Sequence, residues 1–168
     1  MTDNAISSGI ELFNSPLETG VRALVVLNAA YPMMFDLSQL TWLDHLVVHT
    51  ADIKGPDSLH PDLPHRTGEL LVRRPVIEES LTLMRRLHLV DVVADDYGIR
   101  YQASEEAYPF VELMRSPYAQ ALKERAKWLA ENVCTLDAHQ LEKLVTEKIG
   151  RWKVEFQGQG QHHRSYDD

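Results

Sequence analysis

The chain of 168 residues lacks several features that mark particular classes of protein. Its single cysteine, Cys134, cannot form a disulfide within the chain, which fits a reducing cytoplasm. No apolar run approaches the roughly 18–20 residues that span a bilayer. The first residues carry acid and no Lys or Arg, so a signal or transit peptide is not expected. We therefore expect a soluble, cytoplasmic protein without a membrane-spanning segment.

Positive charge is also scarce, above all in the first part of the chain. The formal net charge is −8, and residues 1–64 hold two basic residues against eight acidic ones. Domains that bind nucleic acid normally carry a basic patch, because phosphate contacts supply nearly all of their non-specific affinity. The charge pattern therefore disfavours direct binding to DNA or RNA.

Sequence motifs that carry catalytic chemistry are missing as well. There is no GxxxxGK[ST] loop, so the chain cannot bind ATP by that route. Cys134 has no predicted histidine partner, and no nucleophile elbow surrounds Ser58. Neighbouring carboxylates such as Glu78 and Glu79 do not converge on a helix, and we interpret them as solvated. We expect neither enzymatic activity nor a cofactor.

One histidine pattern leaves a metal site open. His45 and His49 are four residues apart on a predicted helix, and His60 and His65 follow in a loop. The metalloprotease form of this motif needs a glutamate after the first histidine, where this chain has Leu46. The alternative is that His45 and His49 are partly buried and bond the loop. We favour this alternative, because spacing alone often gives false matches, and we predict no metal ligands.

The hydrophobic pattern predicts a mainly helical chain. Capping boxes at residues 15–18 and 36–39 predict a helix that ends near Ala30 and a second helix that begins after Asp36. Pro75 is predicted to open a third helix over residues 75–88, whereas residues 69–73 fit either one helical turn or a short strand. The predicted buried face of this third helix consists of Val76, Ile77, Leu81, Leu83, Met84 and Leu87.

After residue 88 the hydrophobic period changes from helical to alternating. His88 tolerates the left-handed conformation that ends a helix. Alternating apolar residues on both sides of the turn at Asp95–Gly98 predict a β-hairpin. Further helices are expected over about 105–114, 117–133 and 136–151. This order predicts a mainly α fold with a small β-hairpin, a winged helix-turn-helix with additional C-terminal helices.

The elements imply an order of domains along the chain. We expect a flexible N-terminus over residues 1–12, a winged-helix domain over 13–133 and a C-terminal helical extension over 134–156. Residues 157–168 lack apolar side chains to bury, which predicts a disordered tail.

Direct DNA reading would require a basic surface on the predicted recognition helix. The exposed side of residues 75–88 instead combines two glutamates with Arg85 and Arg86, and the tip of the hairpin is Asp95-Asp96. Such a surface does not attract phosphates, which favours a protein partner.

The candidate partner interface lies in a long segment and in the arginine pair that follows it. Residues 50–67 show no helical or strand period, and connections of this length are usually functional or disordered. Its prolines and turn-forming residues favour an ordered excursion. The arginines are expected to meet acids of a partner or a phosphate, with simple exposed charges as the alternative. The predicted interface residues are Asp52, Gly55, Pro56, Ser58, Leu59, His60, Pro61, Arg73 and Arg74. Met33, Met34 and Phe35 fit either a core plug or a docking patch.

Residues Ser15 to Leu129 contain five stretches that resemble a known family: SPLETGVRALVVLNAAYPMMFDLSQLTWLDHLVVHTAD, GPDSLHP, RTGELLVRR, LMRRLHLVDV and GIRYQASEEA. On these stretches the chain resembles the middle component of bacterial ABC-three-component systems. Close relatives include the small third subunit of Lamassu-type anti-phage defence complexes. Lys54 and His88 depart from the family pattern, which has a smaller residue and a glycine there.

The resemblance implies a non-catalytic adaptor subunit that bridges an SMC-like ABC-type ATPase and an effector, often a nuclease. DNA would then be met only indirectly, through the complex. The fold prediction alone leaves an alternative, a winged-helix DNA-binding transcription regulator that dimerises through its C-terminal helices.

Overall fold

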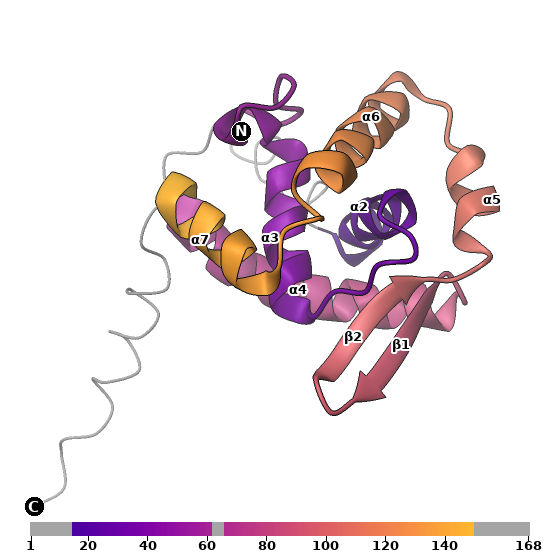
Figure 1. Ribbon diagram of the computed structural model, residues 1–168. Helices are drawn as coiled ribbons and strands as arrows, with labels where there is room; N and C mark the ends of the chain where they lie inside the picture. Colours follow the sequence, from indigo (N-terminus) through magenta and orange to yellow (C-terminus); the bar gives the residue numbers. More distant parts are fainter. Residues whose placement is uncertain (1–14, 62–65, 150–168) are drawn as a thin grey trace, which may run out of the picture.

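Helix α2 (Pro16–Ala29) begins as its capping sequence predicts and lies at the centre of the fold. The computed structural model describes residues 15–61 and 66–149. The Ser15 hydroxyl accepts a hydrogen bond from the Glu18 amide at 3.3 Å, and Pro16 stands at the first helical position. Residues 22–27 are all buried. Helices α3, α4, α5 and α6 pack around α2, which therefore forms the middle of the hydrophobic core (Figure 1).

Helix α3 (Leu37–Val48) carries the second predicted capping box, and both of its hydrogen bonds are present. The Gln39 amide donates to the Asp36 carboxylate at 2.8 Å, and the Asp36 amide donates to the Gln39 side chain at 2.9 Å. The helix is buried over its last two turns, from Leu40 to Val48. It presents polar as well as apolar side chains to the interior.

Helix α4 (Arg66–Arg86) is much longer than the sequence predicts. The expectation that Pro75 opens a helix is wrong, because Pro75 lies inside α4 and residues 69–73 belong to the same helix. Pro75 lacks an amide proton and is exposed, so the interruption faces solvent. Buried residues on both sides of it, Leu70 and Ile77 among them, hold the two halves against the core. Leu87, predicted to be buried, is 48% exposed.

A glycine brings α2 and α4 into close contact. A Cβ atom at Gly20 would lie 2.8 Å from the end of the Met84 side chain and 3.3 Å from the Ser80 carbonyl oxygen. A larger residue would require the Met84 side chain to move and would lie tightly against the backbone of α4 at Ser80.

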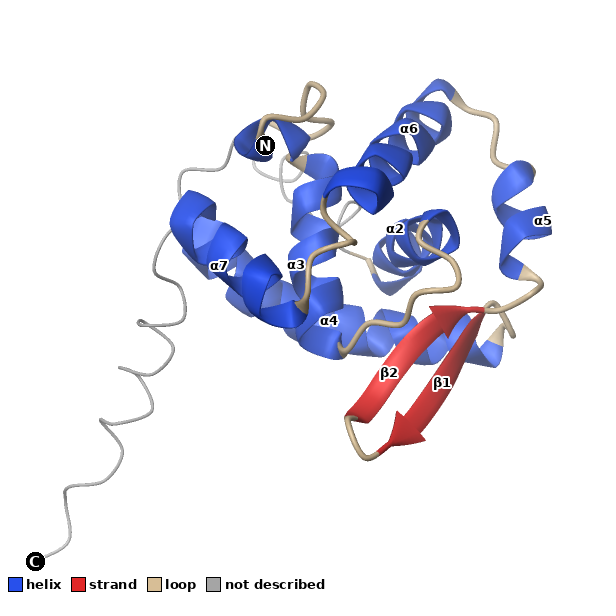
Figure 2. Cartoon of the chain, in the orientation of Figure 1, coloured by secondary structure: helices blue, strands red, loops and turns tan. Residues whose placement is uncertain are grey.

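The predicted hairpin consists of β1 (Val90–Asp95) and β2 (Gly98–Ala103), paired antiparallel. His88 has a φ of 61°, so it ends α4 in the left-handed conformation as expected. Phe35, which precedes α3, is buried and pairs with Tyr101 of β2 through two backbone hydrogen bonds of 2.8 and 3.0 Å. Phe35 thus belongs to the core, whereas Met33 is 37% exposed. The hairpin projects from the helical body (Figure 2).

Three helices complete the described part of the chain: α5 (Ala107–Glu112), α6 (Pro117–Asn132) and α7 (Ala138–Ile149). Helix α5 is shorter than the predicted 105–114, and its buried residues are Ala107 and Val111. Helices α6 and α7 agree with the prediction, with caps at Ser116 and Asp137. The mainly α fold with a small β-hairpin is therefore confirmed. No helix of the described residues is long and apolar enough to cross a bilayer.

The long segment is shorter and more regular than predicted. Residues Thr50–Ile53 form a 3-10 helix, η1, and α4 already begins at Arg66. Residues 54–61 have no helix or strand, in agreement with the prediction. Residues 1–14, 62–65 and 150–168 lie outside the described residues, so the expectations for both ends of the chain and the domain boundaries remain predictions.

Candidate functional site

A buried ion cluster joins the three central helices. Asp44 of α3 accepts hydrogen bonds from Arg22 of α2, at 2.9 Å from Nε and 3.2 Å from Nη2, and from Arg73 of α4. All three side chains are buried, with exposed fractions of 1%, 3% and 5% respectively. Thr19 accepts a further hydrogen bond from Arg22 at 3.3 Å. One carboxylate therefore ties α2, α3 and α4 together.

The charges of this cluster are mutually stabilised. Burial alone would raise the pKa of Asp44, but the positive charges of Arg22 and Arg73 and their hydrogen bonds hold that pKa below its usual range. Burial likewise tends to lower the pKa of Arg22, and Asp44 more than offsets it. Removal of one partner from a buried ion pair leaves an uncompensated charge, which typically costs about 3–5 kcal/mol. The cluster thus supports the helix arrangement.

A series of aromatic rings runs from the buried His45 to the partly exposed Tyr118. His45 and His49 are buried, and their ring centroids lie 4.5 Å apart. His60 lies edge-on to His49 at 6.2 Å between centroids, and its Nε2 is hydrogen-bonded to the Tyr118 hydroxyl at 2.9 Å. Burial and the charges of Arg22 and Arg73 lower the pKa of His60 to about 4.

The two histidines of α3 and its end, His45 and His49, are packed in the interior. His45 lies 3.9 Å from the Asp52 carboxylate of η1, so it does contact the segment that follows α3. Within the described ranges, no group of three or more His, Cys, Asp or Glu side chains could hold a metal ion. His65, the fourth residue of the metal hypothesis, lies outside the described residues.

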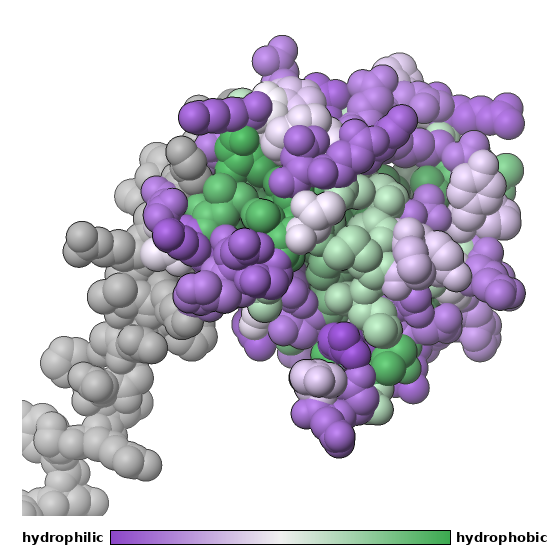
Figure 3. All heavy atoms as spheres, viewed as in Figure 1, coloured by the Kyte–Doolittle hydropathy of each residue, from purple (hydrophilic) through white to green (hydrophobic). Residues whose placement is uncertain are grey.

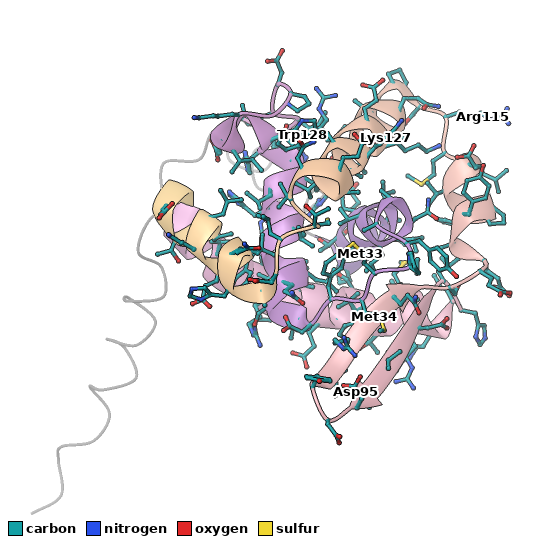
Figure 4. The ribbon with its side chains drawn as sticks, viewed as in Figure 1. Met33, Met34, Asp95, Arg115, Lys127 and Trp128 are labelled. Carbon is teal, nitrogen blue, oxygen red and sulfur yellow. The ribbon has the colours of Figure 1, made fainter. Side chains whose placement is uncertain are left out.

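The segment from Lys54 to Pro61 is held against α6. The carbonyl of Asp57 accepts hydrogen bonds of 2.9 and 3.1 Å from the Arg125 guanidinium. A Cβ atom at Gly55 would lie 2.8 Å from the ring of Trp128, a side chain labelled in Figure 4. Lys54 has a φ of 62°, so its backbone adopts the left-handed conformation that glycine favours. The segment is an ordered excursion, as predicted.

The predicted interface residues of this segment differ in accessibility. Ser58 accepts a hydrogen bond from the Ala51 amide at 3.2 Å, and the Leu59 amide donates to the Val48 carbonyl at 3.0 Å, so both stabilise the turn. Pro61 is exposed. Asp52, Gly55, Pro56 and His60 are half-buried.

The arginine pair is split between the interior and the surface. Arg74 is exposed and donates to the Ser38 hydroxyl at 2.7 Å, whereas Arg73 points into the ion cluster. The expectation that both arginines face a partner therefore does not hold for Arg73, because its guanidinium serves Asp44. Arg22 and Asp44 were not predicted as a pair. The sequence does contain a sign that both are buried, because each is an isolated charged residue in a largely apolar run, VRALVVL for Arg22 and LDHLVV for Asp44.

The exposed faces of α4 and the hairpin carry the charges expected from the sequence. Glu78, Glu79, Arg85 and Arg86 are all exposed on α4. At the tip of the hairpin, Asp95 accepts hydrogen bonds from the Tyr97 amide and from Arg100, and Tyr97 is 87% exposed. These surfaces combine acids, bases and an exposed aromatic ring; of these, Arg and Tyr are residue types enriched in protein interfaces.

The fold is thus that of a small helical protein with a β-hairpin, whose buried polar groups fix the packing of its helices. The model of the ABC-three component (ABC-3C) system Middle Component 2 family matches residues 12–155. This match covers most of the chain, and the protein belongs to that family. The predicted middle component is confirmed. No protein of curated function and no solved structure matched the chain.

Proposed function

We propose that this protein is a non-catalytic, cytoplasmic adaptor that bridges an SMC-like ABC-type ATPase and a nuclease-type effector in a Lamassu-type anti-phage defence complex. Membership of the middle component family carries this proposal, since a component of a three-component system acts together with other components. DNA is then met through the assembled complex and not by this chain alone.

The arrangement of elements supports a winged helix-turn-helix. Helices α2, α3 and α4 are followed directly by the hairpin. Phe35, in the connection between α2 and α3, forms an antiparallel bridge with Tyr101 of β2. It therefore pairs with the hairpin as a third, one-residue strand. In this arrangement α4 is the recognition helix and the hairpin is the wing.

The surface charges favour protein docking over DNA reading by that winged helix. The described exposed residues of α4 carry three bases, Arg74, Arg85 and Arg86, beside the acids Glu78 and Glu79, and the wing tip carries Asp95 and Asp96. A phosphate backbone would be repelled by the tip and only weakly attracted by the helix. We therefore assign α4 and the wing to the ATPase, and the segment from Lys54 to Pro61 to the effector.

Co-purification from cells that express the neighbouring genes tests this function. The tagged chain is expected to retain both the ATPase and the effector at about 0.15 M salt. A chain that elutes as a monomer beside the ATPase, with and without ATP and DNA, would contradict the proposal.

The winged-helix arrangement also favours a second candidate, a DNA-binding transcription regulator. An electrophoretic shift with a short palindromic fragment from upstream of the gene tests it. Sequence-selective binding by the purified chain would support the regulator, and failure to bind at moderate salt would reject it.

A further inference from the structure

An open hollow lies at the base of the hairpin, between the end of α2 and the start of α5. It has a volume of about 430 Å³ and is lined by Asn28, Tyr31, Ser104, Glu105 and Tyr108. The residues come from three separate parts of the chain: the end of α2, the connection after β2, and α5. This volume is within the range of protein ligand sites and accommodates a long side chain.

The walls of the hollow are aromatic, and the one charged residue among its described lining residues is an acid. Tyr31 and Tyr108 are 55% and 62% exposed, so their rings are accessible to a ligand. Glu105 is exposed and none of the five lining residues is basic. A cation attracts both the face of an aromatic ring and a carboxylate, which makes this combination suited to a guanidinium or ammonium group.

The polar groups of the hollow are available for binding. Within the described part of the chain, the Asn28 amide, the Glu105 carboxylate and the two tyrosine hydroxyls form no hydrogen bonds to protein groups. Ser104, in contrast, donates to the His88 carbonyl at 2.7 Å, and its amide donates to Leu89 at 3.0 Å. Ser104 therefore fixes the floor of the hollow to the end of α4, while the other four side chains offer contacts.

Exposed apolar side chains stand close in sequence to the two tyrosines of the hollow. Helix α5 exposes Phe110 to 38%, and Leu113, which follows the helix, is 76% exposed. The loop after α2 adds Met33, and a pale green area covers this loop at the centre of Figure 3, where Figure 4 labels Met33 and Met34. Arginine is one of the residues enriched among the anchors of protein interfaces, so a basic side chain of a partner suits a hollow lined by tyrosines and an acid.

We infer that this hollow receives an arginine or lysine side chain of the ABC-type ATPase. The inference rests on the proposed function, and it names the ATPase because the hollow adjoins the base of the wing, the surface assigned to that partner. Tyr31 and Tyr108 hold the cation between their rings, Glu105 pairs with its charge, and the Asn28 carbonyl oxygen accepts one of its hydrogen bonds.

The test compares two adjacent glutamates in the full-length protein. Both Glu105 and Glu106 are exposed, but only Glu105 lines the hollow. Affinity for the purified ATPase is measured by calorimetry at about 0.15 M salt. Glu105→Lys is expected to weaken binding about tenfold or more, and Glu106→Lys by less than about threefold. Tyr108→Ala is expected to weaken binding about tenfold, whereas Tyr108→Phe retains the ring and most of the affinity.

The outcomes separate this inference from the proposed function. If the unaltered chain binds neither the ATPase nor the effector, both proposals fail. If it binds the ATPase and the two lysine variants bind equally well, only the assignment of the hollow fails. If Glu105→Lys loses binding to the effector and keeps binding to the ATPase, the assignment of the hollow is also contradicted. Circular dichroism of each variant confirms that its fold is intact.

Discussion

The guanidinium of Arg73 lies against the carboxylate of Asp44, although 29 residues separate them in the sequence. Arg73 stands two positions before Pro75, in the part of α4 for which the sequence left one helical turn or a short strand open. The pair draws this first half of α4 onto α3, and Arg22 completes the cluster from α2. The residue next to it, Arg74, is exposed and donates to the Ser38 hydroxyl at the surface.

These neighbouring arginines give a matched test of the buried cluster. Arg73→Ala should lower the free energy of unfolding by about 3–5 kcal/mol, because Asp44 loses one of its two cations in a buried site. Arg74→Ala should change it by less than about 0.5 kcal/mol, since its contact is exposed. Urea denaturation followed by circular dichroism measures both. An effect of Arg73→Ala as small as that of Arg74→Ala would show that the cluster does not stabilise the fold.

The contact of the segment with α6 predicts a steric effect at Gly55. Gly55→Ala places a methyl group 2.8 Å from the Trp128 ring and 3.0 Å from the Thr50 carbonyl oxygen, which should cost about 1–3 kcal/mol. The measurement is a double-mutant cycle with Trp128→Leu, in which the smaller partner should relieve part of that cost. If the costs of the two substitutions simply add in the double mutant, Gly55 and Trp128 do not interact, and the predicted contact is contradicted.

His60 predicts a pH dependence of stability. Its pKa in the folded protein is about 4, below the usual value of about 6.5, because it is half-buried and lies near the positive charges of Arg22 and Arg73. The unfolded chain therefore binds the proton more readily. Stability should be full above about pH 6.5 and fall by roughly 1–3 kcal/mol as the pH drops to 4.

Denaturation at several pH values, with two histidine variants, checks this dependence. His60→Gln should flatten the slope between pH 6.5 and 4, whereas His139→Gln, at an exposed position of α7, should leave it unchanged. The lowered pKa of Asp44 acts in a different range, since its contribution is lost only below about pH 4. A slope that persists in His60→Gln would assign it to another group.

The burial of Cys134 predicts that its thiol does not react in the folded protein. It is 1% exposed, and burial raises its pKa to about 12, so almost no reactive thiolate forms at neutral pH. Iodoacetamide should label no thiol in the native protein and one after unfolding in urea. Rapid labelling of the native protein would show that the connection between α6 and α7 opens readily.

Local signals predicted most of the fold. The caps at Ser15 and Asp36, the left-handed stop at His88 and the turn after Asp95 depend on neighbouring residues, and each was found as predicted. Pro75 misled the prediction because its unfavourable effect is local, whereas the burial of Leu70 and Arg73 that maintains the helix is tertiary.

The candidate sites depended more on tertiary contacts, and the sequence predicted less of them. Asp44 pairs with two arginines only because three helices cross at one point. The hollow likewise joins Tyr31 and Tyr108, which are far apart in the chain and share no sequence motif. Residue types alone do not indicate which exposed side chains will meet.

The bridging role is tested most directly by mixing the purified ATPase and effector with and without this chain, and measuring molar mass by light scattering after size-exclusion chromatography. The account predicts one assembly with all three proteins, and separate ATPase and effector peaks when the chain is omitted. Association of the ATPase with the effector in the absence of the chain would contradict it.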